Sequence, residues 1–365
     1  MKGESMTHKE RFLTAINHEE PDRVPIDVWY TPEAERKLLK HLGQDTEKLS
    51  LYAADGGYLP HLMGHDFLIT WIGPCTSYYA QEEEEYVDEW GIRWRWIDTE
   101  TGNRYTEMVG HPMAETDDLD LLDIPDFKDP SRYGPSRDMI EKYGREFGIM
   151  GGLACTLFEL SWYLRGMDRV LEDMIVNKDF LHAYLDKLLT WVWDAGEVLV
   201  DMGVDVIWIG DDFGSQDRML ISPDLFREFF KPRYHRLFSH LRGKNRDLKF
   251  AFHTDGYNWP IIQDLIDAGV DILNPVQPKS MDPGELKMKY GKKLTFWGTI
   301  DNQETMPFGS VQDVINETKE RLRTVAPGGG LILGPAHNVQ PQVPIENIMA
   351  FYETVKKHGI YPISV

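Results

Sequence analysis

Two histidines and an aspartate stand where a metal site could form. His253 and Asp255 directly follow the strand-like run Lys249–Phe252, and a glycine comes next. Residues i and i+2 of an extended chain point to the same side, so both side chains should face one way where the strand ends. His337 closes a second apolar run, Gly330–Ala336. Two imidazoles and a carboxylate suit Zn²⁺ or a similar divalent ion, with an open position left for a substrate.

Carboxylates suited to acid–base chemistry stand near these positions. Asp211 and Asp212 follow the strand-like run Val204–Gly210, and Glu159 lies near the start of a predicted helix. Adjacent residues after a strand point in opposite directions, so at most one aspartate should face the site. We expect Asp212 and Glu159 to be the catalytic, proton-handling groups, and Asp212 could also hold an imidazole in one tautomer. The alternatives are a helix cap or turn for an aspartate and a surface salt bridge for Glu159.

Further side chains near the same strand ends are candidates for substrate binding. The tryptophans are numerous enough to line an apolar pocket for a planar ligand, and filling of the core is the alternative role for each. The substrate-binding candidates are Asp211, Gln216, Arg165, Trp208, Asp301, Gln303 and Asn338.

From Met139 to the C-terminus, strand-like and helical runs alternate. This rhythm is typical of βα units on a parallel sheet, and polar residues cluster just after the strands, at the edge that carries the active site of a (β/α)8 barrel. We therefore predict an α/β fold, a (β/α)8 TIM barrel. A doubly wound open sheet is the alternative, although we find no Gly-rich phosphate loop. The predicted strands are 147–151, 204–210, 249–252, 271–276, 294–298 and 331–334, after an N-terminal strand at 24–29.

Residues 78–110 differ in character from the segment before them, and residues 116–135, rich in Asp and Pro, are expected to be a surface connection. An acidic run, Glu82–Glu85, precedes alternating aromatic, charged and β-branched residues that extend to Trp96. This alternation predicts an antiparallel hairpin inserted near the N-terminal third, and the acidic run is expected to be a solvated face. We predict a single domain over residues 1–365, within which 78–135 form an insertion.

Bulk composition narrows the classes of partner. The chain has 365 residues, 39 Lys plus Arg and 60 Asp plus Glu, and a net charge of −21. That charge argues against a nucleic acid or an anionic membrane as partner. Two cysteines, Cys75 and Cys155, exclude a disulfide framework. The polar N-terminus lacks a signal-peptide apolar region, and no run reaches the roughly 20 apolar residues of a membrane span. We expect a cytoplasmic protein.

The chain resembles the uroporphyrinogen decarboxylase superfamily, and within it the branch of corrinoid-linked (cobalamin-dependent) methyltransferases. The resemblance covers nearly the whole chain and implies a (β/α)8 barrel. It rests on KERFLTAINHEEPDRVPID near the N-terminus, GDDFGSQDRMLISPDLFREFFKPRYHRL, FHTDG, AGVDILNPVQP, FWGTIDNQ and GPAHNVQPQVPIENI.

The resemblance also implies a ligand set. In that branch a His-x-Cys pair and a later Cys hold zinc, and a methyl group passes to or from a corrinoid protein docked over the barrel mouth. The pair maps onto His253 and Asp255, and the later Cys falls close to His337, so two of the three ligands differ here. A His/Asp/His set still suits zinc but is harder than a thiolate set. The difference disfavours thiol alkylation and favours an oxygen-linked substrate such as a methoxylated compound.

True uroporphyrinogen decarboxylases carry an N-terminal Arg-rich segment that grips substrate carboxylates, and the stretch VWYTPEAERKLL lacks it. We therefore predict a metal-dependent methyltransferase component that acts on a small molecule, with zinc or another divalent metal as cofactor and a corrinoid protein as partner. Two alternatives stay open. One is a decarboxylase or lyase whose small carboxylated substrate is held by arginines such as Arg165, and the other is a non-catalytic corrinoid- or tetrapyrrole-binding protein.

Overall fold

A parallel sheet dominates the computed structural model, which describes residues 6–46, 58–72, 84–98 and 104–365. Within these residues the sheet has seven strands in the order β1-β5-β6-β7-β8-β9-β10. All of them pair in parallel, as the βα rhythm predicts. The strands are β1 (Phe67–Ile72), β5 (Gly148–Leu153), β6 (Val206–Gly210), β7 (Lys249–His253), β8 (Ile272–Val276), β9 (Thr295–Ile300) and β10 (Leu331–Pro335).

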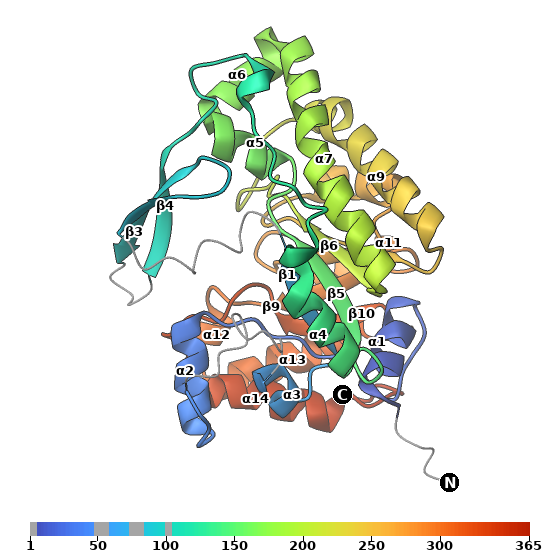
Figure 1. Ribbon diagram of the computed structural model, residues 1–365. Coiled ribbons are helices and arrows are strands. Elements are labelled where there is room, and N and C mark those ends of the chain that lie inside the picture. Colours follow the sequence, from blue (N-terminus) through green and yellow to red (C-terminus); the bar gives the residue numbers. More distant parts are fainter. Residues whose placement is uncertain (1–5, 47–57, 73–83, 99–103) are drawn as a thin grey trace.

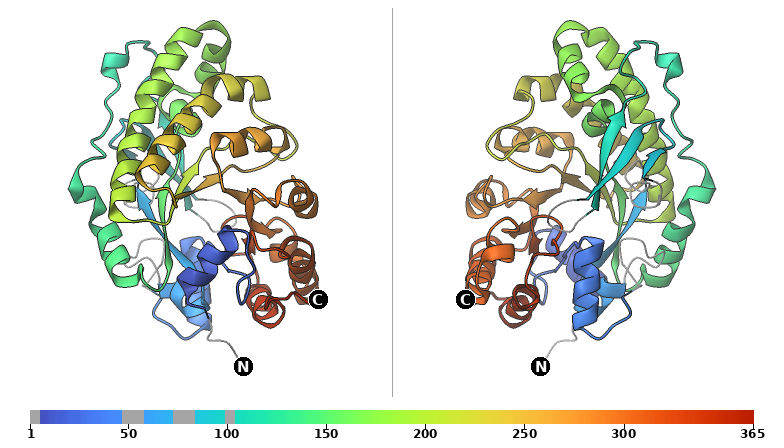
Figure 2. Two further views of the ribbon diagram at one scale, coloured as in Figure 1. Left: turned by 90° about the vertical axis from the view of Figure 1, so that its right-hand side faces the viewer. Right: turned by 90° about the vertical axis from the view of Figure 1, so that its left-hand side faces the viewer.

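The sheet is curled, because side chains from its distant strands touch. The rings of Phe67 on β1 and Trp297 on β9 lie 5.1 Å apart, centroid to centroid. In a flat sheet, strands five places apart would be separated by roughly 24 Å. The seven strands therefore form a half-barrel with helices on its outer side (Figure 2). Its inner side holds a separate apolar cluster: Phe12, Ile16, Phe67, Met150, Val206, Trp208, Ala251, Ile272, Trp297 and Ile332.

The predicted N-terminal strand runs beside β10 as a set of isolated bridges. Ile26 pairs in parallel with Leu333, and Tyr30 pairs in parallel with Val339. The approach is close: a Cβ on Gly334 would lie 1.9 Å from the carbonyl oxygen of Asp27. Only a glycine at position 334 allows this close contact, so Gly334 is what lets the N-terminal segment pack directly against β10. By contrast, the sequence did not predict β1.

Helices surround the sheet. The first, α1, begins with the capping box that Thr7 and Glu10, three residues apart, predict from the sequence: the Thr7 hydroxyl accepts from the Glu10 N–H at 3.2 Å, and the Glu10 carboxylate accepts from the Thr7 N–H at 2.8 Å. The helices are α1 (His8–Ile16), α2 (Pro32–His41), α3 (Tyr58–Met63), α4 (Gly134–Tyr143), α5 (Phe158–Arg165), α6 (Met167–Val176), α7 (Lys178–Met202), α8 (Pro223–Leu225), α9 (Lys231–Lys244), α10 (Ile262–Ala268), α11 (Pro283–Tyr290), α12 (Thr305–Phe308), α13 (Val311–Val325) and α14 (Ile345–His358).

A second, antiparallel sheet stands away from the curled sheet (Figure 1). It consists of β2 (Glu85–Val87), β3 (Arg93–Asp98) and β4 (Arg104–Gly110). The alternation up to Trp96 therefore does mark antiparallel strands. The sequence also predicts a turn over residues 101–104, but residues 101–103 and part of the acidic run lie outside the described residues. The sheet packs on α5, where the rings of Trp94 and Tyr163 lie 5.8 Å apart.

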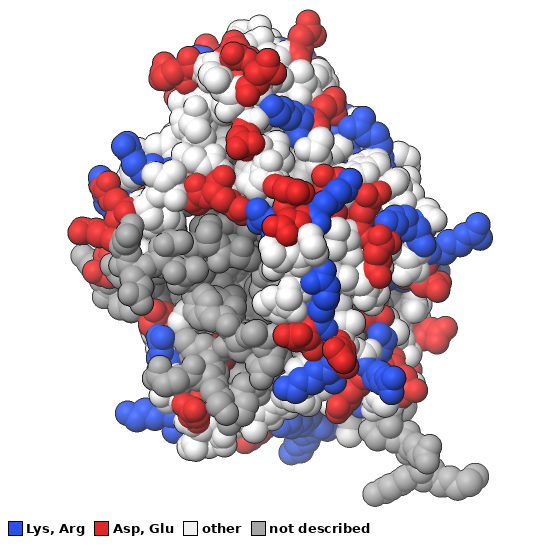
Figure 3. Space-filling model, viewed as in Figure 1, with Lys and Arg blue, Asp and Glu red and all other residues white. Residues whose placement is uncertain are grey.

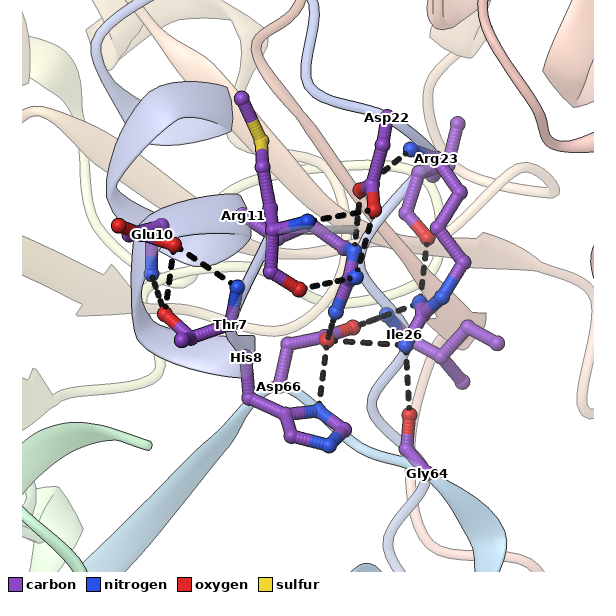
Figure 4. Close-up of polar contacts among 11 residues, drawn as sticks. Thr7, His8, Glu10, Arg11, Asp22, Arg23, Ile26, Gly64 and Asp66 are labelled. Carbon is purple, nitrogen blue, oxygen red and sulfur yellow. Dashed lines mark hydrogen bonds and ion pairs between the residues drawn. The ribbon is translucent and has the colours of Figure 1, made fainter. Parts of the chain in front are cut away.

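A buried ion cluster ties α1 to the start of β1 (Figure 4). The Asp66 carboxylate, which is fully buried, accepts hydrogen bonds from Arg11 at 2.7 Å and Arg23 at 2.8 Å. It also lies 3.0 Å from the ring of His8 and accepts from the Ile26 N–H at 3.1 Å. Because Asp66 precedes β1, this cluster sits at the end of the sheet opposite the strand carboxyl termini. It fixes α1 and the segment beside β10 against the sheet.

The surface mixes both signs of charge. Figure 3 shows acidic and basic side chains interspersed over one face of the molecule. In the part of the chain that the structure describes, no helix has both the length and the apolar character that crossing a membrane requires.

Candidate metal and active site

The structure brings His253, Asp255 and His337 together at the carboxyl end of the curled sheet. His253 ends β7, and His337 lies two residues beyond β10. One ligand atom from each residue lies within 4.8 Å of the others. The His253 Nε2 atom is 3.8 Å from the Asp255 carboxylate, and the His337 Nε2 atom is 3.7 Å from it. Two imidazoles and a carboxylate at these separations fit a small divalent cation placed between them.

Neighbouring strand ends hold two of the three side chains in place. The Asn274 side-chain oxygen on β8 lies 2.7 Å from Nδ1 of His253. After β8, the Gln277 amide donates to the Asp255 carboxylate at 3.1 Å, and its oxygen accepts from the Gly256 N–H at 2.6 Å. Gly256 has φ of 78°, and a Cβ there would lie 2.3 Å from the Ser215 oxygen. The glycine after Asp255 thus lets the loop turn beneath the site.

The two adjacent aspartates point in opposite directions, and Asp212 is the one that faces the site. Its carboxylate lies 3.9 Å from Nε2 of His253 and accepts from the Asp255 N–H at 2.7 Å. Burial raises the pKa of Asp212, and the charge of Asp255 adds to the rise, while His253 and His337 act to lower it. Asp212 is therefore placed to orient the ligands or exchange a proton with a group held beside them.

Asp211 faces the interior and is fully occupied. Its carboxylate accepts from the Leu157 and Glu159 N–H groups at 2.8 Å, from the Tyr234 hydroxyl at 2.5 Å, and from Thr156. Burial raises its pKa to about 6, although these hydrogen bonds act to lower it. Asp211 thus caps the start of α5, the alternative role that the sequence left open, and it has no oxygen free to bind a substrate.

Glu159 occupies the first turn of α5, where Asp211 holds its backbone. The Tyr163 hydroxyl donates to its carboxylate at 3.2 Å, and the Cys155 thiol donates to the same hydroxyl at 3.5 Å. Burial raises the pKa of Glu159 well above its ordinary value, with Cys155, Asp212 and Asp211 adding to the rise. The surface salt bridge considered above is thus not the role of this carboxyl. A carboxyl with a raised pKa keeps its proton to a higher pH than an ordinary carboxyl, and such a group can act as a general acid.

A cluster of tryptophan side chains lies beside His253. Trp29 stacks on the His253 ring at 6.1 Å with an interplanar angle of 19°. It also makes edge contacts with Trp71 at 5.6 Å, Trp208 at 5.9 Å and Trp297 at 5.3 Å. Trp208 and Trp297 are buried, whereas Trp29 and Trp71 are half-buried. Trp208 therefore fills the inner core, and the two half-buried indoles are the ones that can reach a ligand.

The remaining predicted substrate contacts divide into three groups. Gln216 and Gln303 are exposed and joined by a 3.1 Å hydrogen bond, which links the loops after β6 and β9, and Asn338 is half-buried next to His337. Asp301 is buried and caps the turn into α12, accepting from the Gln303 N–H at 2.8 Å. These positions leave the two glutamines and Asn338 as candidates.

Arg165 is not free to bind a substrate, contrary to the sequence-based expectation. Its side chain is completely buried, and all five guanidinium N–H groups can be assigned to partners. It donates to Asp173 at 2.5 and 3.4 Å, to Asp117 at 2.6 Å, and to the carbonyls of Met113 at 2.9 Å and Thr116 at 2.8 Å. Arg165 therefore holds α5 to the 113–117 segment and α6.

Sequence reasoning missed Asn274, Gln277, Trp29 and Tyr163. Trp29 and Tyr163 follow strand or helix patterns that look like ordinary core. Asn274 is a polar residue inside a buried strand, and that is a usable signal, because such a residue needs a specific partner.

A curled parallel sheet with polar side chains gathered at its carboxyl edge is the architecture of barrel-like α/β folds, which place their sites at that edge. Comparison with known proteins identifies the family. The family model for uroporphyrinogen decarboxylase (URO-D) matches residues 98–358, and the chain belongs to this family.

The relatives that this chain resembles include proteins named as methyltransferases and proteins named as decarboxylases. The chain is 28% identical over 210 residues to "Methylcobamide:CoM methyltransferase MtaA" of Methanosarcina barkeri, a match that spans 58% of each chain. It is 23% identical to the uroporphyrinogen decarboxylase of Legionella pneumophila, over 96% of this chain and 97% of that protein. The solved structure of a methyltransferase from Methanosarcina mazei has the same fold, with a TM-score of 0.73, 24% identity, and coverage of 97% of this chain and 99% of that one.

Proposed function

We propose that this chain is a metal-dependent methyltransferase component that moves a methyl group between a small methoxylated substrate and a corrinoid carried by a partner protein. The observation that carries the proposal is the convergence of His253, Asp255 and His337 to within 4.8 Å. Zinc or a similar divalent ion held by these residues would act as a Lewis acid on the substrate oxygen. The named methylcobamide methyltransferase among the relatives supports the corrinoid part of the proposal.

The chain's own side chains have distinct roles in this proposal. Trp29 stacks on His253 and meets Trp71 edge to face, and the exposed parts of these two indoles offer apolar ring surface to the ring of a methoxylated aromatic compound. When the methyl–oxygen bond breaks, the oxygen must gain a proton. Glu159, whose pKa burial raises, supplies that proton, and Asp212 positions the group that receives it. Gln216, Gln303 and Asn338 contact the substrate at the rim.

The proposal includes a complete barrel, with the N-terminal segment as its eighth strand. Residues 24–30 fill the position of an eighth strand beside β10, and we propose that they complete a (β/α)8 barrel. The chain then forms one domain over residues 1–365, and 78–135 are an insertion that carries the antiparallel sheet. The contact between Trp94 and Tyr163 connects this insertion to the helix that bears Glu159.

Metal content tests the proposal most directly. We expect about one zinc per chain after zinc is supplied, and its loss in the double variant His253→Ala/His337→Ala with the fold retained by circular dichroism. The matched control is His240→Ala, because His240 pairs with Glu197 at 2.7 Å on a surface helix. A parallel assay follows methylation of an added corrinoid protein with methoxylated aromatic compounds. Full zinc content in the double variant would refute the assigned ligand set.

A URO-D-like decarboxylase is the second candidate, because the Legionella relative aligns with almost the whole chain. That reaction needs cations to hold substrate carboxylates, and the one arginine that we proposed for this, Arg165, is already paired. Carbon dioxide release from a porphyrinogen or a smaller carboxylated substrate by metal-free protein would favour this candidate over methyl transfer.

A further inference from the structure

The buried amide of Asn274 bridges two side chains that bear on the metal site. Asn274 is 4% exposed and is the register partner of His253 across β7 and β8. Its oxygen lies 3.0 Å from Nε1 of Trp208 and 2.7 Å from Nδ1 of His253. Both contacts involve the same atom of the Asn274 amide. Whether that atom is the oxygen or the nitrogen therefore decides whether the two facing ring nitrogens must donate a hydrogen.

The indole settles the orientation of the amide. An indole N–H can only donate, so the Asn274 atom opposite it must be the oxygen. A ring nitrogen facing that oxygen at 2.7 Å must in turn carry a hydrogen. The neutral His253 ring therefore has its proton on Nδ1, which leaves the lone pair on Nε2.

That lone pair points into the carboxylate and imidazole cluster. Nε2 of His253 lies 3.8 Å from Asp255 and 3.9 Å from Asp212, too far for a hydrogen bond. A lone pair and two carboxylates that face one another repel unless a cation lies between them. Nε2 of His253 thus faces two carboxylates but has no hydrogen-bond partner among the described residues, which leaves it available as a ligand atom.

We infer that Asn274 is a positioning residue, which fixes the tautomer of His253 so that Nε2 is free to bind a metal, and that Trp208 fixes Asn274. The inference rests on the proposed metal site for its purpose, but the tautomer is a property of the metal-free chain. Groups that orient a metal-binding histidine typically change metal affinity by about 10- to 100-fold when they are removed.

The test begins with the metal-free protein. Nitrogen-15 NMR of labelled histidines, at a pH where imidazole is neutral, reports which ring nitrogen carries hydrogen. We expect the Nδ1–H form for His253 in the native chain and in Asn274→Asp, whose carboxylate still accepts. In Asn274→Leu we expect that form to lose its dominance and zinc affinity to fall by about 10- to 100-fold.

A matched variant separates positioning from general destabilisation. Asn347 is also buried (2% exposed), and its amide donates to the Met306 and Gly309 carbonyls at 2.9 Å. Asn347→Leu should weaken the fold and leave the His253 signals unchanged. If Asn274→Leu does not fold, Trp208→Phe provides the second test, because the amide is then free to turn and the His253 signals should become mixed.

Two results would overturn the inference: an Nε2–H form of His253 in the native chain, or an unchanged Nδ1–H form in both Asn274→Leu and Trp208→Phe. A chain that shows the expected tautomers but binds no zinc would support the positioning role and refute the metal-dependent function, so the two failures are distinguishable.

Discussion

Replacing Asp66 by asparagine removes the carboxylate that the guanidinium groups of Arg11 and Arg23 share (Figure 4). The variant keeps the shape of the side chain and loses its charge. Breaking a buried ion pair from one side typically costs about 3–5 kcal/mol, since the remaining charge stays buried without its partner. We expect the lower end, about 3 kcal/mol, because Arg11 keeps two contacts to Asp22, at 2.5 and 2.8 Å.

The effect should depend on pH in a defined direction. Burial acts to raise the pKa of Asp66, but His8, Arg23 and Arg11 outweigh it and the pKa lies below its ordinary value. A carboxyl with a lowered folded-state pKa contributes stability above its unfolded pKa of roughly 3.9, and that stability disappears as pH falls through the lower folded value. The difference between native chain and variant should therefore be complete at neutral pH and shrink below about pH 4.

Urea unfolding followed by circular dichroism measures the difference at several pH values. Asp217→Asn is the control, since Asp217 pairs with Arg218 on the exposed surface and its loss should not shift the midpoint. A free energy of unfolding for Asp66→Asn within about 1 kcal/mol of the native value at neutral pH, the range of an exposed pair, would refute the view that this cluster holds α1 and β1 together.

Two further predictions concern the site. Burial raises the pKa of Glu159, so activity that needs its proton should decline as pH rises through that pKa. In Glu159→Gln we expect most of the turnover to be lost and the residual pH–rate profile to lack this decline. A profile with the same decline as that of the native chain would exclude Glu159 as the acid. Trp29→Ala should raise KM for a methoxylated aromatic substrate by up to about tenfold, since one aromatic contact contributes about 0.5–1.5 kcal/mol. Zinc content should stay unchanged in Trp29→Ala, and equal KM values would show that this indole does not meet the substrate.

The sequence predicted the regular elements well where local signals are strong. The sequence predicts helices at 311–325 and 345–358, and α13 and α14 have these bounds, because an apolar stripe and, at α13, the Ser310 capping box are local properties. β1 was missed because its run FLITWI lies between segments of mixed composition. Residues 24–29 are predicted as a strand, but this segment pairs with β10 only through isolated bridges, because pairing depends on the partner strand as well as on the local sequence.

The site was predictable in part for the same reason. A histidine directly after a strand marks the carboxyl edge, and that rule placed His253, Asp255 and His337 together. It could not show which of Asp211 and Asp212 faces the site, because this depends on α5, whose first N–H groups bind the Asp211 carboxylate. Nor could it show that Arg165 is enclosed, since its partners Asp117 and Asp173 come from a loop and another helix.

The position of α1 has a consequence for kinetics. Phe12 and Ile16 of this helix belong to the apolar cluster inside the curled sheet, and both are essentially without solvent exposure. With that end closed, the substrate and the carrier protein of the proposed reaction would both reach the site from the strand carboxyl ends. A carrier docked there would cover a substrate that is already bound and would exclude one that is not. The reaction we propose should therefore follow a compulsory order, with the small molecule first, and excess carrier protein should inhibit it.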